Sequence, residues 1–272
     1  MEKVRITDSI SETLFINIPM KAGEHARLDG ILKDPFSAQL VKRLDYDFSR
    51  FASAPLSRIG VVVRARYFDE ESMAFLNANK GKNLIVVHVG AGLDTRFLRI
   101  DGAGQPAVFY ELDLPDVIDL REKVLPPLEN EHLIRASMFE TDWMDDLSAR
   151  HPDGHFLFVI EGICMYFPEA KLRQFFRDLA QRFSGEILCD LLNVWMSKNS
   201  KKHDVLKKME AEFAFGIDDE KRIEQWHPRL HYVKTALIMK QHPARWGFFI
   251  SHFFANLPFI KKSSKMVTYR LE

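Results

Sequence analysis

Short apolar runs alternate with helix-like segments through the middle of the chain, and this alternation limits the possible folds more than any other feature. Asn83–Val89 is the clearest run: it is rich in β-branched residues and ends at Gly90. Such runs are typical of parallel strands that are buried on both faces. Further runs lie at 107–113, 132–136, 155–161 and 186–192, with helical patterns at 115–125 and 168–183. The sequence therefore predicts an α/β fold with a doubly wound, mostly parallel sheet.

The segments on either side of this core have other patterns. Residues 1–80 look helical, and we predict helices over Ile31–Arg43, where Asp34-Pro35 comes before an apolar pattern, and over Val61–Leu76. After the core we predict a charged helix at Lys201–Phe213 and two final strands at 231–239 and 265–271, which bring the sheet to seven strands. Because no Gly/Ser-rich linker interrupts the chain, we expect one domain over 1–272, divided into a helical cap (1–80), a core (81–194) and a final part (195–272).

Charge and composition narrow the functional classes. The 272 residues include 38 Lys and Arg and 38 Asp and Glu, so the formal net charge is zero, which argues against a nucleic-acid partner. Cys164 and Cys189 lie in apolar runs, so we expect reduced thiols and a cytoplasmic protein. Met1–Glu12 lacks the apolar core of a signal peptide. The most apolar stretch, Phe248–Ile260, has 13 residues and is too short to span a membrane, so we expect a core or interface segment and no membrane partner.

A glycine-rich turn follows the first predicted strand. The run Val89-Gly90-Ala91-Gly92-Leu93-Asp94-Thr95-Arg96 leads from that strand into a predicted helix. Small residues let the backbone turn tightly and approach a ligand, and the free amides of the helix N-terminus lie beside it. Ligands of open α/β sheets bind at the carboxyl ends of the strands. We interpret Gly90, Ala91 and Gly92 as a binding loop, and the alternative is a strand-to-helix turn that binds nothing.

Two acidic residues end the next predicted strand. Glu111 and Asp113 follow the glycines at the separation of about 20 residues at which an acid binds the ribose hydroxyls of a nucleotide-like ligand. Alternatively, Asp113 caps the helix that begins at Leu114-Pro115. A dinucleotide fingerprint has a third glycine where this chain has Thr95, which weakens a pyrophosphate-binding interpretation. S-adenosylmethionine needs a ribose-binding acid and has no phosphates.

Several motifs, in this order, resemble one known family. The runs GAGLDTRFLRI (90–100), YELDLPDVIDLREKVLP (110–126) and FVIEGICMYF (158–167) are similar to leucine carboxyl methyltransferases, and within that family to the bacterial O-methyltransferases of tetracenomycin polyketides. Asp34-Pro35, Arg64–Asp69, Arg245-Trp246 and Tyr269–Leu271 also match, so the resemblance covers most of the chain. It implies the Rossmann-like fold of class I methyltransferases, S-adenosyl-L-methionine as the cofactor of the core, and a small-molecule methyl acceptor bound by the cap and the final part.

The resemblance also implies roles for single residues on the cofactor side. Gly90 and Gly92 would lie against the amino-acid end of the cofactor. Arg64 would bind the carboxylate of that end or the acceptor, and the alternative is a surface charge. Asp113 would hold the ribose hydroxyls, with Glu111 as the alternative.

The remaining implied residues follow the third and fourth predicted strands. Ser137 and Met138 stand where the family contacts adenine, although the family has an acid at 137, so Asp142 or the backbone is the alternative contact. Glu161 matches the acid of the family's E-x-x-x-x-Y motif, and Tyr166 would face the acceptor. The alternatives are a helix cap for Glu161 and a core aromatic ring for Tyr166. Asp94, Thr95 and Arg96 could instead be structural residues of the glycine turn.

None of these motifs contains a convincing general base or a metal site. His88 lies in the middle of a predicted strand, where we expect a core residue, and the histidines and cysteines lack metal-binding spacings. A carboxylic acid with a pKa of roughly 4 is ionised at neutral pH, whereas a phenol with a pKa of roughly 10 benefits from a base. A carboxylate acceptor is therefore favoured. The rival interpretations are a nicotinamide-dependent oxidoreductase and a non-catalytic domain that docks through residues 248–260.

Overall fold

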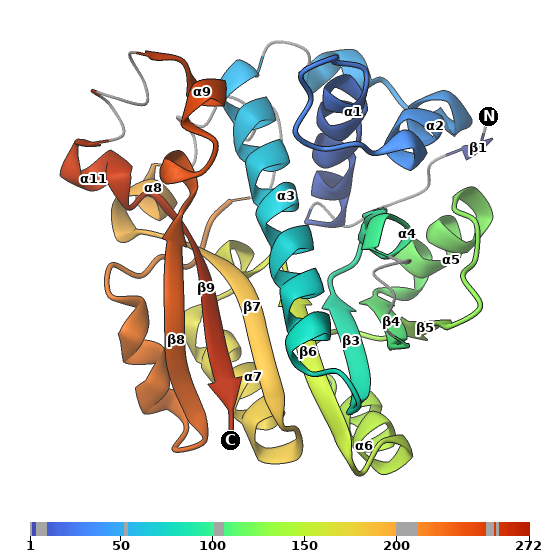
Figure 1. Ribbon diagram of the computed structural model, residues 1–272, viewed down its shortest axis with the longest axis vertical. Coiled ribbons are helices and arrows are strands. Elements are labelled where there is room, and N and C mark those ends of the chain that lie inside the picture. Colours follow the sequence, from blue (N-terminus) through green and yellow to red (C-terminus); the bar gives the residue numbers. More distant parts are fainter. Residues whose placement is uncertain are drawn as a thin grey trace.

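A seven-stranded sheet with the order β5-β4-β3-β6-β7-β9-β8 is the centre of the computed structural model, which describes residues 2–3, 10–51, 54–100, 106–199, 212–248, 253 and 256–272 (Figure 1). Its strands are β3 (Asn83–Val89), β4 (Val108–Asp113), β5 (Glu131–Arg135), β6 (Gly154–Ile160), β7 (Gly185–Leu192), β8 (Leu230–Leu237) and β9 (Ser264–Leu271). Strand β9 runs antiparallel to both of its neighbours, and the pairings among β3 to β7 are parallel. The predicted mostly parallel sheet is confirmed, and every predicted strand agrees with the structure to within two residues.

Helices cover both faces of the sheet. On β3, Ile85 and Val87 pack into the core formed with α6 (Asp142–Arg150) and α7 (Glu169–Arg182). Leu84 and Val86 point to the other face, which is covered by α3 (Pro55–Ala78) and α4 (Arg96–Ile100). Successive side chains of a strand point to opposite faces, so an uninterrupted apolar run is buried on both sides. Figure 1 shows α3 crossing one face, with α6 and α7 behind the sheet.

The cap covers the end of the sheet where the parallel strands finish. It consists of α1 (Leu14–His25), α2 (Pro35–Arg43) and the first turns of α3, with the short elements β1 (Glu2–Lys3), η1 (Ser11–Thr13), β2 (Leu44–Asp45) and η2 (Phe48–Phe51). Helix α2 begins at Pro35 and not at Ile31, because the Asp34 carboxylate accepts a hydrogen bond from the Ser37 amide at 2.9 Å and so caps the helix there. Phe15 and Ile18 of α1 pack in one apolar cluster with Leu120 of α5 (Pro115–Val124).

Short helices occur in the second half of the chain. They are η3 (Cys164–Tyr166), α8 (Val194–Lys198), η6 (Glu220–Trp226), η7 (Ile238–Lys240), α9 (Pro243–Trp246) and α11 (Pro258–Lys261), of which η6 packs against α7 and β8. In Figure 1, α8, α9 and α11 lie beside the first turns of α3, at the upper end of the view. The helix predicted at Lys201–Phe213 lies mostly outside the described residues, and the described Glu212 and Phe213 are not helical. In the part that the structure describes, no helix is long and apolar enough to cross a bilayer.

Candidate active site

The glycine turn is held against the end of the neighbouring strand. Gly90 and Gly92 have φ angles of +66° and +52°, in the left-handed region that favours glycine. The Gly90 and Ala91 amides donate to the Leu112 carbonyl at 2.8 and 3.1 Å, and the Gly92 amide donates to Oδ2 of Asp113 at 2.7 Å. The loop and the end of β4 are therefore one hydrogen-bonded unit.

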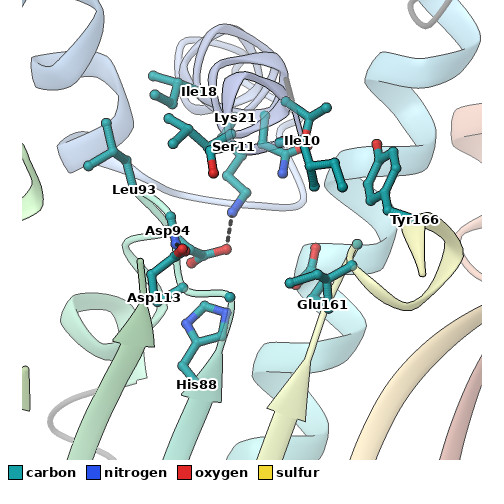
Figure 2. A pocket seen from close by; sticks show the side chains of 18 of the residues that line it. Ile10, Ser11, Ile18, Lys21, His88, Leu93, Asp94, Asp113, Glu161 and Tyr166 are labelled. Carbon is teal, nitrogen blue, oxygen red and sulfur yellow. Dashed lines mark hydrogen bonds and ion pairs between the residues drawn. The ribbon is translucent and has the colours of Figure 1, made fainter. Parts of the chain in front are cut away.

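A small polar cavity of about 90 Å³ lies between this loop and the cap (Figure 2). Its walls come from the glycine loop, the ends of β3, β4 and β6, and the cap residues between Ile10 and Lys21. The cavity is narrow because Ile163 packs directly on the loop: a Cβ on Gly90 would lie 2.3 Å from its Cδ1. Of the predicted site residues, the lining includes Gly90, Ala91, Gly92, Asp113, Glu161 and Tyr166.

The structure separates the two acids of β4. Asp113 lines the polar cavity, and its second oxygen, Oδ1, accepts a hydrogen bond from the Leu114 amide at 2.7 Å. Burial raises the pKa of this carboxyl. It is not the N-cap of α5, because that position is Leu114. Glu111 is fully buried below the cavity, where it accepts a hydrogen bond from Arg121 and does not line the site.

His88 is buried, as the sequence predicts, yet it also lines the floor of the polar cavity (Figure 2). Its Nδ1 lies 3.1 Å from Oε2 of Glu111, and its Nε2 lies 3.4 Å from Nη1 of Arg96. The ring therefore connects the cavity floor with the charged groups beneath it.

A network of buried charges supports the glycine turn. Arg96 is fully buried and donates to Oδ1 of Asp69 at 2.9 Å and to Oε2 of Glu161. Arg99 donates to Oδ2 of Asp69 at 2.8 Å and to Thr95 Oγ1 at 2.6 Å. Buried charges are tolerated when they are paired and hydrogen-bonded. The structure thus gives Thr95 and Arg96 structural partners.

Lys21 of α1 is a cavity residue that the sequence analysis missed. Its side chain is 2% exposed, and its Nζ lies 2.5 Å from Oδ2 of Asp94, an ion pair that joins the cap to the glycine turn (Figure 2). Burial opposes ionisation of Asp94, but Lys21, Arg96 and Arg99 together hold its pKa well below the usual range. The only signal in the sequence is one lysine within the otherwise largely apolar run 14–22, whose partner lies 73 residues away.

A second, larger cavity of about 610 Å³ adjoins the polar one. The two share the residues Thr13, Asn17, Gly162 and Tyr166. The larger cavity is mainly apolar, with walls from α3, η3, α8, η7, α9 and α11 and from the segment around Phe213. The lining includes Met165, Trp195, Met196, Phe213, Met239 and Trp246. Its size and lining are those of a site for a small organic molecule.

Arg64 lines the larger cavity and is held by two acids. Its Nε donates to Oε1 of Glu161 and its Nη1 to Oδ2 of Asp190, both at 2.9 Å. Nη2 faces Gly162, where a Cβ would lie 3.0 Å from it. Although burial opposes ionisation, Arg96 and Arg64 lower the pKa of Glu161 to about 2. Arg64 is therefore a largely but not fully buried cation at the junction of the two cavities, and not a surface charge.

Tyr166 stands at the same junction. It lines both cavities, and so does Thr13. Burial raises the pKa of its phenol to about 12, so the hydroxyl is neutral and can donate at physiological pH. Because Tyr166 lines both cavities, it is not simply an aromatic ring of the core.

The residues predicted beside adenine lie outside both cavities. Met138 is buried in the core that faces α6, and Ser137 accepts a hydrogen bond from the Phe139 amide through its Oγ at 3.3 Å. Asp142 is exposed at the start of α6. The adenine contact of these residues stays a prediction. Within the described residues, no group of His, Cys, Asp or Glu side chains could hold a metal ion.

Comparisons with known proteins identify the family. The family model of leucine carboxyl methyltransferases matches residues 18–180. The chain is 30% identical over 232 residues to the tetracenomycin polyketide synthesis O-methyltransferase TcmP of Streptomyces glaucescens, covering 85% of this chain and 83% of that one. It is 26% identical to the S-adenosyl-L-methionine-dependent methyltransferase dpfgK of Gibberella zeae, covering 90% and 87%.

A solved structure shares the fold. Magnesium protoporphyrin IX methyltransferase from Synechocystis PCC 6803, with bound S-adenosylhomocysteine, has a TM-score of 0.50 at 10% identity and covers 88% of this chain and 100% of that one. The polar cavity lies where open α/β sheets bind ligands, with Asp113 at the end of β4 in its wall. The chain belongs to the leucine carboxyl methyltransferase family and is an S-adenosylmethionine-dependent methyltransferase with a class I fold.

Proposed function

We propose that this methyltransferase transfers a methyl group to a carboxylate oxygen of a small, largely apolar molecule that binds in the larger cavity. The observation that carries the proposal is the chemistry of that cavity's wall. Among the described residues that line it there is no Asp, Glu, His, Lys or Cys side chain. Tyr166 and Arg64, the titratable groups that do line it, hold their protons, because burial raises the pKa of Tyr166 to about 12 and the pKa of Arg64 is raised as well.

A reaction without a base at the acceptor requires an acceptor that is already ionised. Carboxylic acids with a pKa of roughly 4 meet this requirement at neutral pH, whereas phenols with a pKa of roughly 10 do not. The titratable groups of the neighbouring polar cavity have partners of their own: Glu161 pairs with Arg96 and Arg64, and Asp94 pairs with Lys21. His88 lies 3.1 Å from Glu111, and Asp113 accepts hydrogen bonds from the Gly92 and Leu114 amides. The relative from Streptomyces glaucescens, named as a polyketide O-methyltransferase, supports an apolar acceptor attacked at oxygen.

The polar cavity would hold the cofactor, which supplies an electrophilic methyl group when bound. Asp113 would accept hydrogen bonds from its ribose, and the glycine loop and Lys21 would contact its amino-acid end. Because Ile163 packs on the glycine loop, we expect its side chain to shift when the cofactor binds. The residues shared by both cavities would then lie around the transferred methyl group.

Arg64 and Tyr166 would position the acceptor. Two guanidinium nitrogens of Arg64 bind Glu161 and Asp190, which leaves Nη2 for a ligand. A hydrogen bond from Nη2 and another from the Tyr166 hydroxyl would orient the acceptor carboxylate. Because Glu161 and Asp190 already balance the charge of Arg64, the contact would orient the carboxylate without a full opposing charge.

An acceptor that carries both a carboxyl and a phenol group tests this proposal in one reaction. We would incubate the enzyme and S-adenosylmethionine with hydroxylated polycyclic aromatic acids and identify the product by mass spectrometry and alkaline hydrolysis. The expected product is a methyl ester that alkali cleaves. A methyl ether on the phenol, with the carboxyl left free, would contradict the proposal.

A further inference from the structure

Exposed apolar side chains are concentrated on the segments that build the larger cavity. Seven large apolar side chains are exposed in the described part of the chain, and five of them belong to segments that build this cavity. Leu56 and Trp195 line it and are 51% and 43% exposed. Phe248, Phe253 and Leu257, with exposures of 66%, 61% and 39%, lie on the chain between its lining residues Trp246 and Ile260. We call these five side chains the apolar rim.

Lysines surround the apolar rim. Lys198 follows Trp195 on α8, and Lys261 and Lys262 follow Leu257 at the end of α11, all of them exposed. Lys240 Nζ donates to Asn256 Oδ1 at 2.7 Å, which holds this lysine beside the rim. Residues 238–263, which include most of the rim, contain four Lys and Arg and no Asp or Glu, although the whole chain has a formal net charge of zero. Of these four, Arg245 is paired with Glu24 and Asp29 of the cap.

We propose that the apolar rim and its lysines form a docking surface for an anionic membrane, from which an apolar acceptor enters the larger cavity. Proteins that rest on a bilayer insert apolar and aromatic side chains while their basic side chains meet the anionic headgroups. The rim and its lysines offer both features on segments that build one cavity. The protein would rest on the membrane surface through the rim; none of the described helices could span a bilayer.

The charge distribution favours a membrane over a second copy of the chain. A two-fold symmetric contact places the same patch on both subunits, so the lysines around one rim would face the lysines around the other. An anionic bilayer supplies the opposite charge instead. An apolar acceptor dissolved in the bilayer could also pass into the cavity without crossing water, since Leu56 and Trp195 belong both to the rim and to the cavity wall.

Vesicle sedimentation tests this surface without cofactor or acceptor, so its outcome is independent of the proposed methyl transfer. We would compare vesicles of phosphatidylcholine with vesicles that also contain phosphatidylglycerol. The wild-type protein is expected to sediment with the anionic vesicles and to be released by salt. Phe248→Asp with Phe253→Asp, and separately Lys261→Glu with Lys262→Glu, should each weaken binding about tenfold or more.

Matched variants on other faces serve as controls. Leu28→Asp changes an exposed leucine of the cap, and Lys80→Glu with Lys82→Glu reverses two exposed lysines before β3. Both should bind vesicles like the wild type. Absence of sedimentation, or equal losses in rim and control variants, would overturn the proposal. So would concentration-dependent self-association that the phenylalanine variants abolish, because the rim would then be an interface between copies.

Discussion

The two cavities of this enzyme are neighbours that share four residues, yet they are built in opposite ways. The polar cavity is surrounded by paired charges such as Lys21–Asp94 and Arg96–Glu161. The larger cavity is lined by aromatic rings and methionines, with Arg64 as its one charged side chain among the described lining residues. Under the proposed assignment, the difference teaches that paired charges surround the end where the cofactor must be aligned, whereas apolar contacts accept the variable body of an acceptor.

Removing a buried charge beneath the polar cavity should have the largest effect. Arg96→Met leaves Asp69 and Glu161 without a shared cation, and breaking a buried ion pair in this way costs about 3–5 kcal/mol. We expect a loss of that size in the free energy of unfolding, measured by denaturant titration. The control is Arg66→Met on the exposed face of α3, where the pair with Glu70 contributes about 0.5 kcal/mol or less. Equal losses in the two variants would contradict the structural role of the network.

Asp113→Ala should act on the cofactor side alone. The variant loses acceptors for two ribose hydroxyls, and hydrogen bonds to a charged group contribute about 1.5–3 kcal/mol each, so cofactor affinity should fall at least about tenfold. Calorimetric titration with S-adenosylhomocysteine measures this loss, with the exposed Asp119→Ala as the matched control. Asp113→Asn should recover part of the affinity, since it keeps one oxygen acceptor. Normal affinity in a folded Asp113→Ala protein would remove the ribose assignment.

The Arg64→Lys variant distinguishes whether Arg64 positions the acceptor or binds the cofactor. An ammonium group cannot reach Glu161, Asp190 and a ligand with the geometry of a guanidinium. If Arg64 positions the acceptor, methyl transfer should slow about tenfold or more while the dissociation constant of the cofactor stays close to that of the wild type. The comparison fails if cofactor affinity falls by the same factor as the rate, because Arg64 would then hold the cofactor's carboxylate.

Gly60→Ala should give the smallest effect: the variant should be slightly more stable than the wild type but should bind the acceptor less well. Gly60 lies inside α3 at the wall of the larger cavity, and a Cβ there would meet Trp246 at an ordinary 3.8 Å. Replacing a helical glycine by alanine stabilises by roughly 0.5–1 kcal/mol. The added methyl should also raise KM for the acceptor severalfold without changing cofactor affinity. An unchanged KM would place the acceptor away from this wall.

The sequence predicts the polar cavity better than the larger one, because the elements around the polar cavity follow from short patterns along the chain. The strands follow from β-branched apolar runs, and the loop follows from Gly90 and Gly92 at the end of one run. Asp113 lies at the end of the adjacent strand, so a spacing along the chain becomes a position in space. Helix α6 escapes prediction, because its pattern of nine residues, with Met144 and Leu147 facing the core, is short.

The larger cavity arises from tertiary packing that no local pattern reports. Its walls combine Leu56 of α3, Trp195 of α8 and Trp246 of α9, which are far apart in the sequence. Arg64 could be singled out by resemblance, but its partner Asp190 is 126 residues away at the end of β7. Lys21 and Asp94 show the same limitation, since only the fold brings the cap onto the glycine turn.

The pH dependence of single-turnover methyl transfer tests the central claim most directly. The claim is that the larger cavity receives an acceptor that is already ionised and needs no base. With saturating cofactor and an apolar carboxylic acid, the rate should be flat between about pH 6 and 9, because an acid with a pKa of roughly 4 is fully ionised there. A rate that rises about tenfold per pH unit across this range would show that a proton must be removed first, and would contradict the account.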